Sequence, residues 1–202
     1  MPELANPLWL LGIVGLLSYA LGSVPFGVVI ARVMGLGDLR QIGSGNIGAT
    51  NVMRTGNKLA GVLTFLLDAG KGAIAALIAW WLLGEDAAQI AALAAFLGHL
   101  YPVYLGFKGG KGVATFIGTA LALAWPVGLA ICAIWLCVFA VSRYSSLAAL
   151  VATAISPVLV AGFGYGSMIA VFVVLGVMIF LKHSENIRRL LAGTESRFTR
   201  KG

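Results

Sequence analysis

Long apolar runs alternate with short polar segments along this chain, and the runs have the length of membrane-spanning helices. The five runs occupy residues 8–33, 59–83, 87–107, 112–142 and 144–181. A helix of about 20 apolar residues crosses the hydrocarbon core of a bilayer. The pattern therefore predicts an all-α, polytopic integral membrane protein, with residues 1–202 forming a single membrane domain.

The last two runs are too long for one span each. Trp125-Pro126 interrupts the first of them, and the glycine-rich stretch 162–166 interrupts the second. Clusters of Gly and Pro are the strongest breaks that a sequence offers. Splitting both runs predicts seven transmembrane helices. Two of these are short, at about 13–15 residues, and need a thinned bilayer or shelter from neighbouring helices.

The basic residues predict the orientation of these helices. If the N-terminus lies outside, the segment 32–58, Lys108 with Lys111, Arg143 and the tail from Lys182 all lie inside, and Glu85 faces outward. Treating 112–142 as one helix would place Arg143 and the basic tail outside. Because Lys and Arg collect on the cytoplasmic side, the charges favour seven spans, an outside N-terminus and a cytoplasmic C-terminus.

Composition supports a membrane protein and excludes a separate soluble domain. Apolar residues make up 60% of the chain and charged residues 10%, far fewer charges than a soluble surface needs. The net charge of +7 follows from the positive-inside rule, so no nucleic acid partner is expected. The polar segments are long only on the inner side, which predicts that the chemistry lies there.

The first segment with chemical promise runs from Gly43 to Asn51 and is rich in Gly, Ser, Asn and Thr. Glycines let backbone N–H groups converge, and such a nest before a helix suits a phosphate group. The segment also fits G-x-G-x-x-G with Asp68 downstream. A dinucleotide site is rejected, because it requires a preceding strand and a βαβ unit.

A second glycine-rich segment follows Gly98-His99 and reads Lys108-Gly-Gly-Lys-Gly112. Positive-inside anchoring would need only the lysines, so the glycines indicate a second anion site. It is not a Walker A loop, because Leu105 and Gly112 stand where Gly and Ser or Thr are required. His99 is interpreted as a hydrogen-bonded core histidine.

Three further groups of residues are candidates. Asp68 and Lys71 share a helical face inside a span, and either serve a function or form a mutual ion pair. Ser142-Arg143 lies on an inner turn, as a phosphate clamp or an ordinary cap. His183 and Asn186 precede a basic tail, which either lies near a bound phosphate or lies on anionic lipid.

In order along the chain, these segments resemble the three motifs of the PlsY-type glycerol-3-phosphate acyltransferases of bacteria, and the resemblance covers essentially the whole chain. The first motif corresponds to Ser44–Asn51 with Arg54. The second corresponds to Gly98–Pro102 and Lys108–Thr115. The third corresponds to His183, Asn186, Ile187, Arg189, Leu190, Gly193 and Glu195.

The resemblance implies transfer of an acyl group from acyl phosphate to the 1-hydroxyl of sn-glycerol 3-phosphate. The products are lysophosphatidic acid and phosphate. The first acylation of bacterial phospholipid synthesis is thereby implied, at the inner (cytoplasmic) membrane and with the active site on its cytoplasmic side. Membrane lipid surrounds the enzyme, and neither a cofactor, a metal nor an obligate protein partner is expected.

The resemblance also carries roles for individual residues. His183 and Asn186 are expected to orient or activate the hydroxyl, with Ser44 as a third catalytic residue; a substrate phosphate oxygen is the other candidate base. Glu195 is expected to pair with a tail arginine. The acyl phosphate is expected on Ser44, Gly45, Asn46, Gly48, Thr50 and Asn51. Glycerol 3-phosphate is expected on Arg54, Lys108, Lys111, Ser142 and Arg143.

Two other classes of function stay open from the sequence. A transporter of small organic anions would suit seven helices with buried charge, but most of the helices lack the polar groups of a transmembrane path. A non-catalytic lipid-binding or assembly subunit would not need two glycine-rich phosphate segments.

Overall fold

The structure, a computed structural model, describes residues 4–198, and its regular elements in that range are all helical. The chain divides into two compact units, which within the described residues span 4–123 and 124–198. We call them the N-terminal and the C-terminal unit. The prediction of an all-α protein is confirmed for the described residues.

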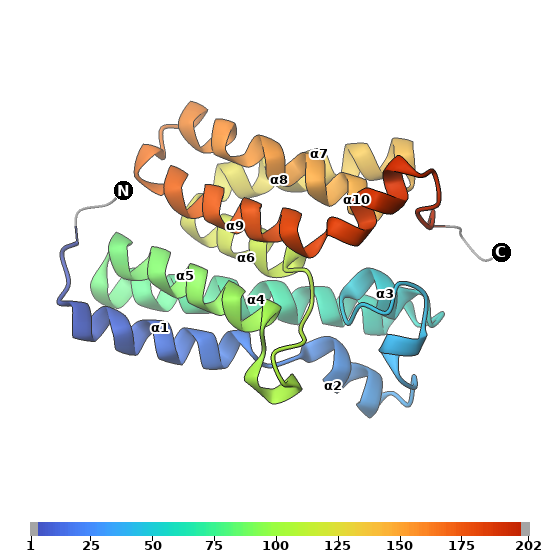
Figure 1. The fold of residues 1–202 in the computed structure, drawn as a ribbon. Helices are drawn as coiled ribbons and strands as arrows, with labels where there is room; N and C mark the ends of the chain where they lie inside the picture. The colour runs from blue at the N-terminus through green and yellow to red at the C-terminus, as the bar shows by residue number, and fades with distance from the viewer. Residues whose placement is uncertain (1–3, 199–202) are drawn as a thin grey trace. The chain divides into compact units, whose positions relative to one another are not determined.

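The N-terminal unit contains six α-helices and two 3-10 turns, and α1, α4 and α5 lie side by side in it (Figure 1). α6 packs on α4. The α-helices are α1 (Leu8–Gly22), α2 (Phe26–Val33), α3 (Ala49–Met53), α4 (Lys58–Leu83), α5 (Glu85–Leu100) and α6 (Val113–Leu123). The 3-10 turns are η1 (Leu39–Gln41) and η2 (Val103–Leu105).

Small residues allow these helices to approach closely, as is typical of helices packed in membranes. A Cβ on Gly22 would overlap the backbone of Ala95 in α5, and a Cβ on Gly98 would overlap the backbone of α1. A Cβ on Gly118 of α6 would overlap the backbone of Ala69 in α4. The core of the unit is accordingly built largely of alanine.

The C-terminal unit is a layer of three long helices followed by a short one. α7 (Trp125–Ser142) packs on α8 (Ser145–Gly162), and α8 packs on α9 (Ile169–Lys182). The short turn η3 (Gly166–Met168) leads into α9. α10 (Ser184–Leu191) follows α9 with a bend of 61° at the break between them.

The predicted helical segments all appear, but not all have the length of a span. Five described segments are long and apolar enough to cross a membrane: Leu8–Val33, Lys58–Leu83, Glu85–Leu105, Trp125–Ser142 and Ser145–Gly162. The bent pair from Gly166 to Leu191 makes a sixth if it counts as one span. The remaining segment, α6, has only 11 residues, about 16 Å against a core of roughly 30 Å.

The first apolar run is broken, where the sequence predicted one continuous helix. α1 ends at Gly22 and α2 begins at Phe26, directly after Pro25. The residue before a proline is disfavoured in the helical region, which accounts for the break. The break exposes the Val24 carbonyl to a side-chain donor, Lys71.

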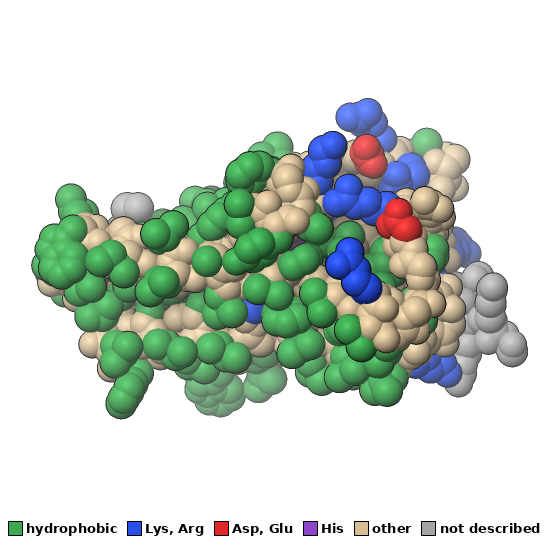
Figure 2. Space-filling view, turned by 90° about the horizontal axis from the view of Figure 1, so that it is seen from below, with side chains coloured by type: hydrophobic (Ala, Val, Ile, Leu, Met, Phe, Trp, Pro, Cys, Tyr) green, Lys and Arg blue, Asp and Glu red, His purple; other side chains and the backbone are tan. Residues whose placement is uncertain are grey.

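Hydrophobic side chains cover most of the outside of these helices. Figure 2 shows hydrophobic side chains over much of the surface in view. Trp81 and Val141 illustrate this, with exposed fractions of 84% and 89%. Such exposure fits a lipid-facing surface and not a water-facing one.

Candidate active site

The first glycine-rich segment is held in shape by one buried amide, that of Asn51. Its Oδ1 accepts from the Ser44 backbone N–H at 3.0 Å and lies 3.3 Å from the Ser44 hydroxyl. Its Nδ2 donates to the carbonyls of Leu39 and Asn46 at 2.9 and 2.7 Å. These bonds engage both ends of the Asn51 amide, so Asn51 shapes the segment, and its predicted contact with the substrate stays a prediction.

Gly43 (φ 54°) and Gly45 (φ 68°) both adopt the left-handed backbone conformation, and together they bend the segment around Ser44. The Gly45 N–H donates to the Ile42 carbonyl, and the Ile47 N–H to the Asn46 side chain. Ser44 itself stays exposed. The structure thus places Ser44 in this bend, Asn46 directly after it, Gly48 at the N-cap of the short helix α3 and Thr50 within α3.

Arg54 follows the end of α3, and its side chain passes over Gly43. A Cβ on Gly43 would lie 2.6 Å from Asn51 Oδ1 and 2.7 Å from Arg54 Cδ. Those distances are too short for any side chain. The glycine is therefore required by the arginine and the amide above it as well as by its own backbone angle.

Gly43→Ala is expected to raise KM for acyl phosphate, the substrate expected on this segment, about tenfold. The added methyl group would displace Asn51 and Arg54. Gly35→Ala is the matched control, since Gly35 has a similar φ of 66° but no atom within 4 Å of a Cβ. The control therefore carries only the backbone strain of about 1–2 kcal/mol. Steady-state kinetics decide: equal KM values in the two variants would contradict the assignment.

The second glycine-rich segment is packed directly onto the end of α5. The Gly109 N–H donates to the Leu100 carbonyl at 3.2 Å, and the Gly110 N–H donates to the His99 carbonyl at 3.1 Å. A Cβ on Gly110 would overlap the His99 ring, and one on Gly112 (φ 86°) would overlap Phe96. The glycines are therefore needed for the close packing of this segment on α5. Lys108 remains exposed.

Arg40 joins the two glycine-rich segments, a role that the sequence analysis missed. Its guanidinium donates to the Lys108 carbonyl at 3.1 Å, and its backbone oxygen would lie 3.2 Å from a Cβ on Gly45. From the sequence, Arg40 registered only as one of several inner positive charges. The N-terminal unit therefore holds the first-segment residues, Arg54, Lys108 and Lys111 in a connected structure.

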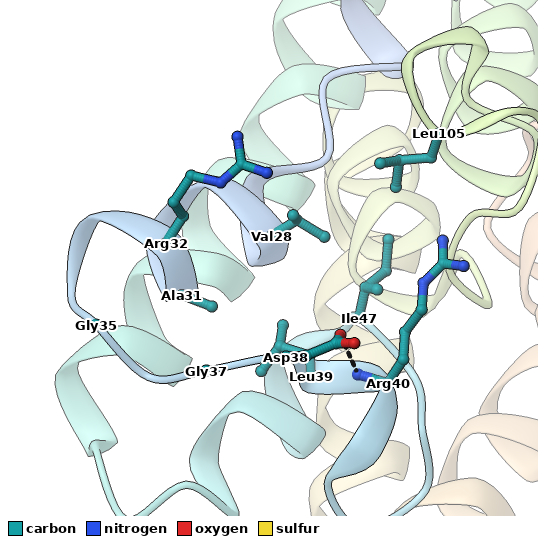
Figure 3. Close-up of a pocket in the computed structure, with 10 residues that line it drawn as sticks. All are labelled: Val28, Ala31, Arg32, Gly35, Gly37, Asp38, Leu39, Arg40, Ile47 and Leu105. Carbon is teal, nitrogen blue, oxygen red and sulfur yellow. Dashed lines mark hydrogen bonds between the residues drawn. The ribbon is translucent and has the colours of Figure 1, made fainter.

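A cavity of about 550 Å³ opens beside these segments, between α2, η1 and η2. Figure 3 shows Arg32 and Arg40 reaching into it from two sides, with apolar side chains between them. Asp38 accepts a hydrogen bond from the Arg40 backbone N–H at 2.9 Å. The apolar side chains are Val28, Ala31, Leu39, Ile47 and Leu105.

In the C-terminal unit, Ser142 and Arg143 form the turn between α7 and α8, as predicted. The Ser142 hydroxyl accepts from the Tyr144 N–H at 3.1 Å, and Arg143 adopts a left-handed φ of 63°. The Phe198 N–H donates to the Arg143 carbonyl at 2.9 Å. A strained residue held this way by its surroundings is typical of functional sites.

His183 lies at the bend between α9 and α10 and is 3% exposed. Its Nδ1 lies 2.8 Å from the Ile179 carbonyl oxygen. Because a carbonyl can only accept, Nδ1 carries the proton in this contact. The neutral ring therefore has its lone pair on Nε2, which is the form that a general base requires.

Asn186 and the turn around Ser146 are joined through Glu195. Glu195 Oε1 accepts from Ser146 Oγ and from Asn186 Nδ2, both at 2.6 Å. Glu195 Oε2 accepts from Arg189 Nε, also at 2.6 Å. The prediction that Glu195 pairs with a tail arginine is confirmed. The carboxylate also fixes the orientation of the Asn186 amide, because only its Nδ2 can donate to Glu195.

Burial works against the ionisation of Glu195, but its three hydrogen bonds and the Arg189 charge outweigh burial, so its pKa lies below the ordinary 4.5. The folded pKa is therefore lower than the unfolded one. The stabilisation from Glu195 is then complete above about pH 4.5 and is lost as the pH falls through the folded value.

Glu195→Gln is expected to lower the melting temperature at pH 7, and the gap to wild type should narrow as the pH falls below 4.5. Thermal unfolding in detergent at stepped pH measures this gap. A gap that stays constant down to pH 3 would mean that the ionised carboxylate contributes nothing.

Among residues 4–198, no group of three His, Cys, Asp or Glu side chains is arranged to hold a metal ion. The predicted site residues are divided between the two units. The N-terminal unit supplies the glycine-rich segments with their cations. The C-terminal unit supplies the Ser142-Arg143 turn and the His183–Asn186 pair.

A family model described as glycerol-3-phosphate acyltransferase matches residues 12–193. The glycerol-3-phosphate acyltransferase of Cereibacter sphaeroides is 62% identical over 201 residues, which cover 100% of this chain and 96% of that protein. The one from Jannaschia sp. is 62% identical over 195 residues and covers 96% of each chain.

Two crystal structures share the fold. PlsY, an integral membrane glycerol 3-phosphate acyltransferase, matches in its glycerol 3-phosphate form with a TM-score of 0.89 and 45% identity, over 94% of this chain and 96% of that one. Its lysophosphatidic acid form matches with a TM-score of 0.86 and 42% identity, over 94% and 95%. Sequence and fold thus point to one family over nearly the whole chain.

Proposed function

The chain belongs to the glycerol-3-phosphate acyltransferase family, and on that premise we propose that it moves an acyl group from acyl phosphate to the 1-hydroxyl of sn-glycerol 3-phosphate. The observation that carries the proposal is the pair of connected glycine-rich segments, with exposed Arg40 and Lys108 and half-buried Arg54 and Lys111 beside them. Both substrates carry phosphate, so an enzyme for this reaction needs two anion sites.

The reaction balances without a cofactor. The glycerol hydroxyl oxygen attacks the carbonyl carbon of the acyl phosphate, the bond from that carbon to the phosphate oxygen breaks, and inorganic phosphate leaves. Because a mixed anhydride is already activated, the attack needs no covalent enzyme intermediate. Positioning and charge stabilisation can supply much of the rate.

His183 is the proposed general base. Its Nδ1–H is held by the Ile179 carbonyl, so Nε2 of the neutral ring can take the hydroxyl proton. Asn186, fixed by Glu195, orients the same hydroxyl. A phosphate oxygen of the substrate is the alternative proton acceptor, in which case His183 only orients.

The phosphate sites divide between the segments. The acyl phosphate is assigned to the bend with Ser44, Gly45, Asn46, Gly48 and Thr50, which Asn51 shapes. The cavity beside Ile47 joins apolar walls to two guanidinium groups, and this chemistry suits an anion with a hydrocarbon chain. Glycerol 3-phosphate is assigned to Arg54, Lys108, Lys111, Ser142 and Arg143.

The proposal includes the membrane topology: one membrane domain of seven spans in the bacterial inner membrane, with the N-terminus outside and the site on the cytoplasmic side. The distribution of Lys and Arg supports this orientation. A cysteine introduced at Glu85 of an otherwise cysteine-free chain should react with an impermeant maleimide in intact cells. One introduced at Lys58 should react only after lysis, and the reverse pattern would overturn the orientation.

A donor comparison tests the activity. Purified protein in lipid should release phosphate from palmitoyl phosphate when glycerol 3-phosphate is also present, and palmitoyl coenzyme A should be inert. No release from folded protein would reject the acyltransferase. The rival, an anion transporter, would then predict uptake of glycerol 3-phosphate into proteoliposomes without product.

A further inference from the structure

Three titratable side chains lie buried inside the N-terminal unit, and the proposed reaction does not use them. Asp68 and Lys71 of α4 are each 2% exposed, and His99 of α5 is 5% exposed. Lys71 Nζ lies 2.8 Å from Asp68 Oδ1, and His99 Nδ1 lies 3.5 Å from the same oxygen. Buried charges are costly within a membrane and usually have a function.

The group reaches beyond mutual neutralisation. Asp68 and Lys71 would neutralise each other without a third member, yet His99 joins them from another helix. Lys71 Nζ also donates to the Val24 carbonyl at 2.9 Å, at the break between α1 and α2, and lies 5.7 Å from the centre of the Phe26 ring. The group thus connects α4, α5 and the broken first span.

Within this group of three side chains, His99 is the one that supports the second glycine-rich segment. The His99 ring fills the space that a Cβ on Gly110 would occupy, and the His99 carbonyl accepts from the Gly110 N–H. Two residues earlier, the Lys108 carbonyl accepts from Arg40. The segment is therefore held between the buried histidine on one side and Arg40 on the other.

We infer that Asp68, Lys71 and His99 form a positioning network that sets where Lys108 and Lys111 are presented to the phosphate group of the substrate. The inference rests on the proposed function of that segment. None of the three needs to touch a reacting atom. Asp68 orients the imidazole, Lys71 balances the carboxylate and fixes it to the first span, and the ring supports Gly110.

The test is a double-mutant cycle between His99 and Lys108. His99→Ala is expected to raise KM for glycerol 3-phosphate about 10- to 100-fold, because loss of the ring lets the segment that carries Lys108 and Lys111 shift by about 1 Å. The value of kcat should change little. In the Lys108→Met background the same change should raise KM by a clearly smaller factor, since one of the two positioned cations is already gone and only Lys111 remains to be misplaced. Equal effects in both backgrounds would overturn the inference.

Two further variants separate positioning from folding. Thr64→Val removes a buried hydroxyl of α4 that bonds within its own helix, to Ala60 at 2.8 Å, and should leave KM unchanged. Gly110→Ala leaves the side chains of Asp68, Lys71 and His99 intact but pushes the segment off the His99 ring, and it should reproduce the rise in KM. If His99→Ala does not fold, Gly110→Ala decides, and an unchanged KM would reject the network.

Failure of the network and failure of the proposed function give different results. Wild-type turnover is measured first in the same preparation. If it is absent, the proposed function fails, and the network is then tested through the Kd of glycerol 3-phosphate by calorimetry. A Kd that His99→Ala and Gly110→Ala leave unchanged would reject the positioning role on its own.

Discussion

Replacing His183 by glutamine is expected to lower kcat by about 10²- to 10⁴-fold, with KM for both substrates changed only a few-fold. Glutamine can still donate a hydrogen bond toward the Ile179 carbonyl, so the position stays filled and paired. What it lacks is the basic Nε2 of the neutral imidazole. The loss should therefore appear in the chemical step and not in substrate binding.

Ser184→Ala is the control for this variant, because Ser184 is the adjacent residue and is exposed. It should keep wild-type kcat. Single-turnover measurements at saturating substrate separate chemistry from product release. Full turnover by His183→Gln would remove His183 from catalysis and leave a substrate phosphate oxygen as the proton acceptor.

The second large effect is expected at Lys108. Lys108→Met should lower kcat/KM for glycerol 3-phosphate by about 10²- to 10³-fold, mainly through KM, because the lost ammonium group is the one assigned to the phosphate of that substrate. Methionine keeps much of the length of the side chain and removes only the ammonium group. The backbone of the segment keeps its bond from Arg40, which uses the Lys108 carbonyl.

Lys58→Met is the matched control for charge. Lys58 is also exposed and begins α4, outside both glycine-rich segments. The two variants lose the same charge from the N-terminal unit. If both lower kcat/KM equally, the effect of Lys108 is a long-range field and not a contact with phosphate, and raised salt would then weaken both alike.

Hydropathy alone predicted where the helices lie, because an apolar run in lipid leaves the backbone few alternatives to a helix. The two predicted breaks appear: the first lies at Ala124, directly before the predicted Trp125-Pro126, which begins α7, and the second lies between Gly162 and Gly166. The break before Pro25 was missed, since the apolar pattern continues through it. The length of α6 was overestimated, because the apolar run extends from Gly112 to the break at Trp125-Pro126, whereas the helix spans only Val113–Leu123.

Contacts between residues close in sequence were predictable where opposite charges pointed to them. The sequence predicted that Glu195 pairs with a tail arginine, which is Arg189 in the structure, and it offered a mutual ion pair as one of two interpretations of Asp68 and Lys71. The third member, His99, lies on another helix and was interpreted as a core histidine. Nothing in its local sequence shows that Gly110 will rest on its ring.

The contacts of Arg40, Arg197 and Phe198 were missed for a related reason. Arg40 binds a carbonyl 68 residues away, and the Phe198 N–H binds the carbonyl of Arg143. Arg197 lies over the Tyr144 ring, 5.2 Å from its centre. Such contacts depend on how loops fold back onto helices, and neither periodicity nor composition records that.

The central claim is tested most directly by measuring lysophosphatidic acid and phosphate together in one reaction of the purified protein. With palmitoyl phosphate and glycerol 3-phosphate present, the account predicts one molecule of each product per turnover, neither when either substrate is omitted, and a strong loss of both in His183→Gln. Phosphate released without glycerol 3-phosphate, or no lysophosphatidic acid from folded wild-type protein, would contradict it.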